Sequence, residues 1–149
     1  MSNGPDARVF HVLLVEDNAA DIYLFRQALE RAGLTFKLTV LTDGGDALAF
    51  AKGDGKHGEG GVPDLLVLDL NLPKVGGCEV LEALRQNANL SNLTVAVMTS
   101  SAASRDYARC TELGVARYVT KPLALEDFLR IGEVVKQLLL EGMFSQHVP

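Results

Sequence analysis

The stretch Leu65–Pro73, with the sequence LLVLDLNLP, decides the fold that we expect. It begins with four apolar residues that do not alternate with polar ones, and an acid, Asp69, follows at once. An apolar run of this kind is typical of a strand that is covered on both faces, as in a parallel sheet. Four more short runs rich in strand-forming residues occur along the chain: Val9–Val15, Phe36–Leu41, Thr94–Met98 and Ala116–Val119.

Segments in which apolar residues recur at helical spacing lie between and after these runs. Because strands and helices alternate along the chain, the sequence predicts an α/β domain with right-handed crossovers. The first expected helix contains Ile22, Phe25 and Leu29 and ends at Gly33, and the second covers Asp46–Lys52, with Asp43 or Gly45 near its start. The third contains Val80, Leu81 and Leu84. The fourth runs from about Ala102 to Leu113, with Ser101 as a candidate N-cap and Gly114 as its stop, and the last contains Phe128, Ile131, Val135 and Leu138.

Length and composition narrow the class of protein. The chain has 149 residues, of which 48% are hydrophobic, and a formal net charge of −5, so we expect one domain that folds alone. The excess of acid argues against binding nucleic acid or anionic membranes chiefly by charge. The apolar runs are far shorter than the roughly 20 residues that span a bilayer, and the polar start lacks a signal-peptide core, so we expect a cytoplasmic protein.

We expect the folded domain to occupy residues 9–140, with a flexible N-terminus at 1–8 and a C-terminal extension at 141–149. A Gly-rich polar stretch at 52–61 lacks the spacing of a phosphate-binding loop and is interpreted as a surface insertion. Cys78 and Cys110 are far apart without a CxxC motif, so we expect reduced thiols, and the histidines show no zinc-ligand spacing.

Polar residues that could carry chemistry follow the predicted strands: Glu16 and Asp17 after the first, Asp69, Asn71 and Pro73 after the third, Thr99 and Ser100 after the fourth, and Lys121 and Pro122 after the fifth. Open parallel sheets bind ligands at the carboxyl ends of their strands, so these residues are expected to share one pocket. Carboxylates crowded there favour a hard cation such as Mg²⁺. A carboxylate beside that cation can attack phosphorus, with Lys121 offsetting the charge.

Taken singly, each of these residues has a plainer explanation. An acid after a strand is most often a turn residue or a helix cap, and the run from Thr99 to Ser101 can be an N-cap cluster. The hypothesis of a phosphoryl-transfer site therefore depends on four strand ends that each supply a residue type needed by one reaction.

Four blocks of sequence resemble those of one known family in their order and spacing: LVEDN at 14–18, LVLDLNLP at 66–73, VMTS at 97–100 and YVTKP at 118–122. Through them the chain resembles the receiver domain of two-component response regulators, the CheY-like proteins. The resemblance implies a doubly wound, flavodoxin-like α/β fold with five parallel strands in the order 2-1-3-4-5. The chain also resembles the stand-alone response regulators of bacterial phytochromes. This resemblance lies in the 52–61 insertion, in the block at 66–73 and in an apolar tail with Met143 and Phe144.

The resemblance implies a phosphoacceptor and a metal site. Asp69 would take a phosphoryl group from the phosphohistidine of a sensor histidine kinase. Asp17 and Asp69 would bind Mg²⁺ or Mn²⁺ directly, with Glu16 acting through a water and Asn71 supplying its main-chain carbonyl. Many receivers have an acid where this chain has Gly76, a difference that removes no metal ligand.

The resemblance also implies residues that act on the phosphoryl group. Lys121 would contact it, and the Lys121–Pro122 peptide bond would be cis. Thr99 and Tyr118 would form the switch that responds to it, whereas Asn71 and Ser101 would tune the lifetime of the phosphoaspartate.

The function implied is a signalling module that catalyses only its own phosphorylation and dephosphorylation. Phosphorylation would change the surface made by the fourth helix, the fifth strand and the last helix. The expected partners are a sensor histidine kinase, with a bacteriophytochrome implied by the subfamily, and a second copy bound through that surface and the C-terminal extension. Neither nucleic acid nor membrane is expected as a partner.

Other functions fit the same residues less fully. The chain could be a phosphorelay intermediate or a phosphate sink for another sensor kinase. A phosphatase with an aspartyl nucleophile would carry a second acid two residues after it, where this chain has Asn71.

Overall fold

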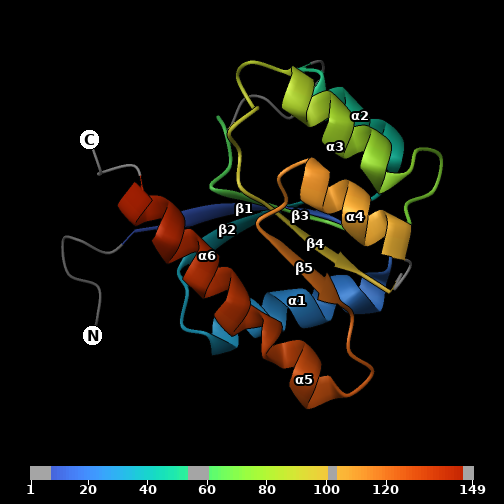
Figure 1. Cartoon of the computed structure of the whole chain (residues 1–149). Helices are drawn as coiled ribbons and strands as arrows, with labels where there is room; N and C mark the ends of the chain where they lie inside the picture. The colour runs from blue at the N-terminus through green and yellow to red at the C-terminus, as the bar shows by residue number, and fades with distance from the viewer. Residues whose placement is uncertain (1–7, 54–60, 101–103, 146–149) are drawn as a thin grey trace.

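The computed structural model describes residues 8–53, 61–100 and 104–145. Its centre is a parallel sheet with the strand order β2-β1-β3-β4-β5, which confirms the predicted fold class (Figure 1). Each predicted strand is present, and its ends agree with the structure to within one residue. The strands are β1 (Phe10–Val15), β2 (Phe36–Leu41), β3 (Leu65–Leu68), β4 (Val95–Thr99) and β5 (Arg117–Thr120).

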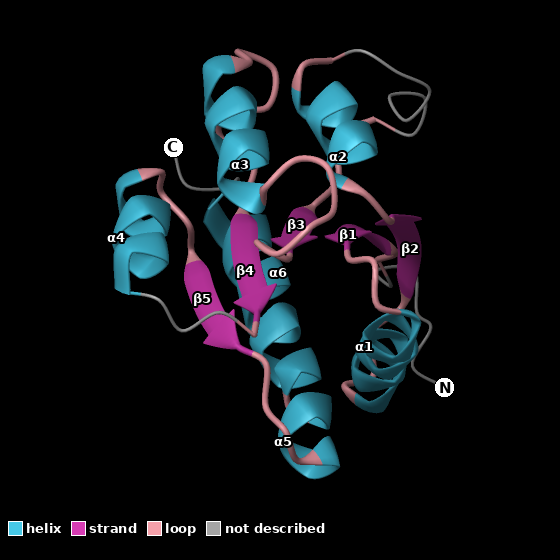
Figure 2. Cartoon of the chain, turned by 90° about the vertical axis from the view of Figure 1, so that its right-hand side faces the viewer, coloured by secondary structure: helices cyan, strands magenta, loops and turns pink. Residues whose placement is uncertain are grey.

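Helices cover both faces of this sheet (Figure 2). On one face the core is shared with α2 (Gly44–Ala51), α3 (Gly77–Gln86) and α4 (Ser104–Glu112). On the other face it is shared with α1 (Ala19–Arg31), α5 (Leu125–Leu129) and α6 (Ile131–Ser145). The sheet is therefore the middle layer of three, as in a doubly wound fold.

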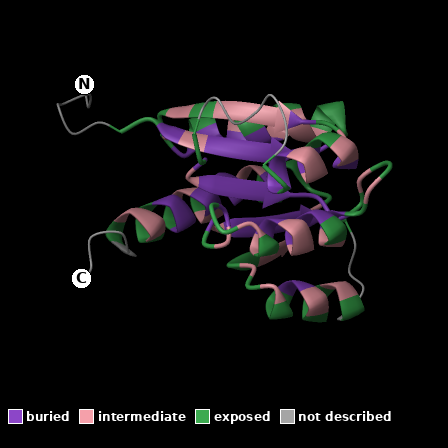
Figure 3. Ribbon diagram, turned by 90° about the horizontal axis from the view of Figure 1, so that it is seen from above, coloured by how far each residue is buried: buried purple, intermediate pink, exposed green. Residues whose placement is uncertain are grey.

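The apolar runs of the sequence follow from this layering. Along β1, Leu13 and Val15 enter the core on the α2–α3–α4 face, whereas Val12 and Leu14 enter the core on the opposite face. The side chains of β3 and β4 are likewise buried, whereas the edge strands β2 and β5 are only partly buried (Figure 3). Strands covered on both faces have no solvent side, so their sequences do not alternate.

The prediction of a single last helix, followed by a C-terminal extension from residue 141, differs from the structure at both ends of this segment. The structure has two helices there, α5 and α6, which are separated at Arg130, and α6 continues to Ser145. The helix continues because apolar side chains recur along it as far as Met143, which packs against the core under α1. A Cβ atom on Gly132 would lie 2.1 Å from the carbonyl oxygen of Ala28, so this glycine lets α6 approach α1 closely.

Smaller predictions about turns have mixed outcomes. Gly33 has φ of 79°, as expected for a left-handed helix end, and α2 is capped by Asp43, whose Oδ1 accepts a hydrogen bond from Asp46 N at 2.8 Å. The predicted cis bond at Lys121–Pro122 is wrong, because the described residues contain no cis peptide bond. The trans form is ordinarily favoured before proline by about 0.5–1 kcal/mol.

Several predictions fall outside the described residues: the Ser101 cap and start of the fourth helix, most of the 52–61 insertion and N-terminal segment, and the end of the C-terminal extension. Within the described part of the chain, both cysteines are free thiols, as predicted. No helix in that part is long and apolar enough to cross a membrane.

Candidate functional site

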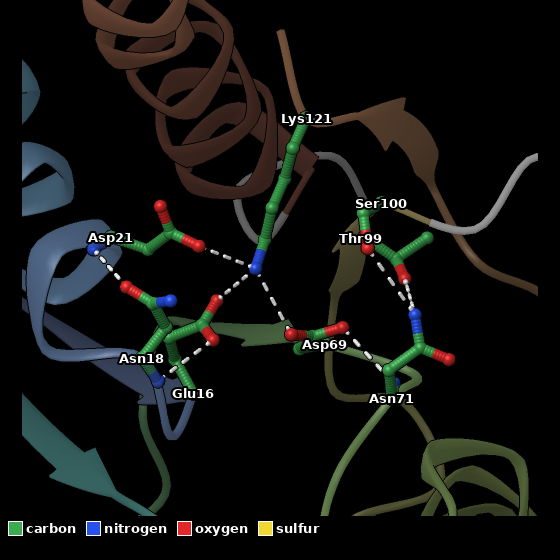
Figure 4. A network of polar contacts seen from close by, with 8 residues as sticks. All are labelled: Glu16, Asn18, Asp21, Asp69, Asn71, Thr99, Ser100 and Lys121. Atoms are coloured by element: carbon green, nitrogen blue, oxygen red, sulfur yellow. Dashed lines mark hydrogen bonds and ion pairs between the residues drawn. The ribbon is translucent and has the colours of Figure 1, made fainter. Parts of the chain in front are cut away.

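The predicted residues at the strand ends meet at one edge of the sheet (Figure 4). Glu16, Asp69 and Lys121 directly follow β1, β3 and β5, whereas Thr99 is the last residue of β4. Main-chain hydrogen bonds continue the sheet through these positions: Asp69 N donates to Val15 O at 3.0 Å, and Lys121 N donates to Thr99 O at 2.8 Å. The main chain at the site is therefore fixed by the sheet itself.

Glu16, Asp17 and Asp69 form an acidic group in which one oxygen from each carboxyl lies within 4.8 Å of the others. Glu16 and Asp69 are buried, and Asp17 is exposed. Burial raises the pKa of Glu16 to about 7, with the charge of Asp69 adding to the rise and the hydrogen bond from Lys121 opposing it.

The donor set of this acidic group fits a divalent cation. The Oε1 atom of Glu16 is buried, and among the described residues its only contact with a donor is the ion pair with Lys121, at 2.7 Å. A buried carboxylate oxygen in this situation has an unused lone pair, and two more carboxylates stand beside it. Oxygen ligands of this kind are those that Mg²⁺ and Mn²⁺ prefer.

Lys121 places its ammonium group among three carboxylates. Its Nζ lies 2.7 Å from Glu16 Oε1, 2.7 Å from Asp21 Oδ2 and 3.0 Å from Asp69 Oδ2. Burial disfavours the charged form, but the hydrogen bonds to Asp21, Glu16 and Asp69 outweigh this effect and raise the pKa of Lys121. The side chain therefore stays cationic at neutral pH and partly offsets the charge of the acids.

Asn71 connects Asp69 to the residues at the end of β4. Its main-chain N–H donates to Asp69 Oδ1 at 3.0 Å, and its side-chain Nδ2 donates to the Thr99 and Ser100 hydroxyls at 3.3 and 3.4 Å. Thr99 is fully buried, whereas Asn71 is exposed. Asn71 thus connects the Asp69 carboxylate to the Thr99 hydroxyl by hydrogen bonds.

Tyr118, the predicted partner of Thr99 in the switch, is half-buried in β5 and packs against the core on the α4 side of the sheet. Its ring meets that of Tyr107 from α4 edge to face, with centroids 5.3 Å apart and an interplanar angle of 68°. This contact joins β5 to α4. Ser101, predicted to tune the phosphoaspartate lifetime, lies outside the described residues.

The loop between β3 and α3 is held by close contacts to glycines. Gly44 N donates to Pro73 O at 3.1 Å, and a Cβ atom on Gly44 would lie 2.1 Å from Val75 O. A Cβ atom on Gly77 would lie 2.6 Å from the Cα of Leu70. Gly76, which stands where many receivers have an acid, is the N-cap of α3 and gives it no side-chain hydrogen bond.

Sequence reasoning misses Asp21, which lies in this site. Asp21 is the third residue of α1, and its N–H donates to the side chain of the N-cap Asn18 at 3.0 Å. Acids are common in the first turn of a helix because they interact favourably with its dipole, so the residue type gives no distinctive signal. Only the folded structure brings it to Lys121, 100 positions later.

Comparisons with known proteins agree with this geometry. Residues 12–132 match the family described as the response regulator receiver domain. The chain is 37% identical over 130 residues to "Response regulator Rcp1" of Synechocystis sp. (strain ATCC 27184 / PCC 6803 / Kazusa), covering 87% of this chain and 88% of Rcp1. It is 39% identical over 133 residues to "Probable methanogenesis regulatory protein FilR2" of Methanothrix harundinacea (strain 6Ac), covering 88% of this chain and 84% of FilR2.

Solved structures give the same family. The phosphorylated cyanobacterial phytochrome response regulator RcpA superposes with a TM-score of 0.81 at 32% identity, over 89% of this chain and 95% of RcpA. The Mn²⁺-bound form of Rcp1 superposes with a TM-score of 0.78 at 36% identity, over 86% of this chain and 92% of that one.

Proposed function

Since this chain belongs to the response regulator receiver domain family and is a phosphorylation-switched signalling protein, we propose that Asp69 is its phosphoacceptor. One observation carries this assignment: Asp69 Oδ2 lies 3.0 Å from Lys121 Nζ, while Oδ1 accepts the Asn71 N–H at 3.0 Å. An oxygen of Asp69 attacks the phosphorus of a phosphohistidine on a sensor histidine kinase. The new O–P bond forms as the N–P bond to the histidine breaks.

The cation in this proposal is Mg²⁺ or Mn²⁺, held by Glu16, Asp17, Asp69 and the main-chain carbonyl of Asn71. The close acidic group supports this, as does the buried Glu16 Oε1, whose ion pair with Lys121 leaves one lone pair unused. The Mn²⁺-bound form of the similar Rcp1 also supports it. When bound, the cation offsets the negative charge on the phosphoryl oxygens.

Lys121 and Thr99 act on the transferred group in this proposal. The Lys121 ammonium donates to one phosphoryl oxygen and the Thr99 hydroxyl turns to donate to another, which favours one of two arrangements of the chain. Tyr118 changes with Thr99, and its contact with Tyr107 carries the change to the surface formed by α4, β5 and the last helix, which is divided into α5 and α6.

The chain catalyses only its own aspartyl phosphorylation and dephosphorylation in this proposal. Asn71 and Ser101 set the lifetime of the phosphoaspartate. The position of Asn71 supports its part, because its exposed side chain stands beside Asp69 and Thr99, where water would approach. A phosphatase acting on small molecules is less well supported, since Asn71 offers no carboxyl to protonate a leaving group.

The test of the central assignment uses Mg²⁺ and acetyl phosphate, followed by intact mass. The protein is expected to gain one phosphoryl group. The Asp69→Asn variant is expected to gain none, while Asp127→Asn, which changes an exposed acid on α5, labels like the wild type. Equal labelling of the wild type and Asp69→Asn would reject Asp69 as the acceptor.

The kinase that we propose is a bacteriophytochrome, so that the signal is red light. Similarity to RcpA, a cyanobacterial phytochrome response regulator, supports this choice. The name of FilR2 refers to methanogenesis and not to light. The alternative is therefore a phosphorelay intermediate or a phosphate sink for another sensor kinase. Phosphotransfer from a panel of purified kinases separates the two: transfer from phytochrome-type kinases is expected, and transfer only from others would select the alternative.

A homodimer through the surface of α4, β5 and the last helix (α5 and α6), together with the C-terminal extension, is also proposed. Apolar side chains exposed there support it: Tyr107, Leu123 and Leu125 on or beside that surface, and Phe144 near the end of α6. Sedimentation with and without acetyl phosphate tests the dimer, with Leu123→Ser expected to weaken it. The matched control is Val62→Ser, which changes an exposed apolar residue before β3. A monomer under both conditions would reject the dimer.

A further inference from the structure

Asp21 lies in the site without belonging to the acidic group of Glu16, Asp17 and Asp69. It occupies the third position of α1, and its side chain is 21% exposed. Its Oδ2 lies 2.7 Å from Lys121 Nζ, as short as the contact from Glu16 and shorter than the 3.0 Å contact from Asp69. In Figure 4 the ammonium lies between Asp21 on one side and Asp69 on the other.

The local structure around Asp21 fixes its position independently of Lys121. Asn18 donates its main-chain N–H to Glu16 Oε2 at 3.2 Å, and its side-chain oxygen accepts the N–H of Asp21 at 3.0 Å. One cap residue therefore sets the start of α1 relative to Glu16. Asp21 is placed by the hydrogen bond from its main-chain N–H to the Asn18 side chain, so it can hold the long and flexible side chain of Lys121.

A lysine ammonium has three N–H donors, and Lys121 faces three carboxylate oxygens. Phosphorylation changes only one of these acceptors, because it converts the Asp69 carboxylate to an acyl phosphate. The donor released from Asp69 can then reach a phosphoryl oxygen, provided that the other two still hold the nitrogen in place. Glu16 and Asp21 are the two acceptors that remain.

From this arrangement we propose that Asp21 is a positioning residue for phosphoryl transfer: it anchors the Lys121 ammonium beside Asp69 from the side opposite the acceptor. The inference rests on the proposed function of Asp69 and Lys121. Asp21 does not touch the transferred group. It acts through Lys121, by leaving one N–H of that residue aimed where the phosphoryl oxygen arrives.

The reaction used to test this anchor is phosphoryl transfer from acetyl phosphate. An Asp69 oxygen forms a bond to phosphorus as the bond from phosphorus to the acetate oxygen breaks, and acetate leaves with that electron pair. Rates are followed by intact mass, at Mg²⁺ concentrations that calorimetry with Mg²⁺ alone shows to be saturating for each variant. Saturation removes the effect that the charge of Asp21 has on metal affinity.

Three substitutions separate anchoring from other roles of an acid. Asp21→Ala removes the contact and is expected to slow transfer about tenfold, which corresponds to about 1.4 kcal/mol. Asp21→Asn loses the same charge but keeps an oxygen that accepts from Lys121, so it is expected to restore most of the rate. Asp46→Ala, the matched control, removes the acid at the third position of α2, which has the same cap hydrogen bond and no contact with Lys121. It is expected to stay within about twofold of the wild type, as a loss of helix-dipole stabilisation alone would.

A double-mutant comparison shows whether Asp21 acts through Lys121. In the Lys121→Ala background, the further change Asp21→Ala is expected to slow transfer less than about twofold, because the residue that it positions is gone. Thermal unfolding of each variant reports any general loss of structure. A wild-type protein that takes up no phosphoryl group would reject the proposed function. A wild type that reacts, with Asp21→Ala reacting as fast as Asp46→Ala, would reject the anchoring role alone.

Discussion

Removing the charge of Glu16 is expected to change how the stability of the metal-free protein depends on pH. Glu16 is fully buried, and burial raises its pKa from the ordinary 4.5 to about 7. The folded protein therefore binds a proton at Glu16 more tightly than the unfolded chain does. The stabilisation from that proton is complete below about pH 4.5 and is lost as the pH rises through about 7. Across this range, Glu16 is expected to lower the free energy of unfolding by about 3 kcal/mol, at about 1.4 kcal/mol for each pKa unit.

The Glu16→Gln variant carries a neutral side chain of similar size at every pH, so it is expected to lack this contribution. Urea unfolding of both proteins in chelator at pH 5, 6, 7 and 8 measures the difference. The free energy of unfolding of the variant, relative to the wild type, is expected to increase with pH. Glu79→Gln, which neutralises an exposed acid on α3, is the control and is expected to run parallel to the wild type. Parallel curves for Glu16→Gln and the wild type would refute the reasoning.

Three further predictions concern the framework that holds the site. Gly132→Ala places a Cβ atom 2.1 Å from a carbonyl oxygen of α1 and is expected to destabilise the fold by about 1–3 kcal/mol. Gly142→Ala in the same helix meets no atom within 4 Å and is expected to stabilise the fold by up to about 1 kcal/mol. Thermal unfolding compares the two variants, and equal shifts in melting temperature would contradict the close packing at Gly132. Arg85 donates to four main-chain carbonyl oxygens in the loops before β4 and β5. Arg85→Lys is therefore expected to lower the free energy of unfolding by at least about 2 kcal/mol, and an unchanged urea midpoint would argue against this role. Tyr107→Ala removes the ring that meets Tyr118 and is expected to lower the free energy of unfolding by about 0.5–1.5 kcal/mol, while Tyr107→Phe keeps the ring and is expected to lower it little. An equal decrease in both variants would assign the effect to the hydroxyl.

The strands were predictable because burial on both faces leaves a plain signal in the sequence. The four apolar residues before Asp69 are all buried in β3, and their pattern requires no knowledge of the neighbouring strands. Strand order and the meeting of Glu16, Asp69 and Lys121 at one edge came from the family resemblance and from the general geometry of parallel sheets.

The remaining features depend on contacts between segments that are distant in the chain. The division of the last helix at Arg130 accompanies the close approach of Gly132 to Ala28 in α1, which the helix's own sequence does not reveal. Asp21 is a similar case. As a residue of the first helical turn it looks like an ordinary dipole partner, and only the placement of α1 beside Lys121 makes it part of the site.

The distances along the chain that separate the contacting residues have a consequence for folding. Lys121 meets Asp21 across 100 positions and Asp69 across 52. Forming contacts between such distant positions closes long loops, which costs conformational entropy, and such contacts are typical of slower folding. The site exists only once β1, β3 and β5 have all taken their places in the sheet. A chain that is still emerging from the ribosome, or one that has lost its last strand, therefore cannot compete with finished molecules for the phosphoryl group of the kinase.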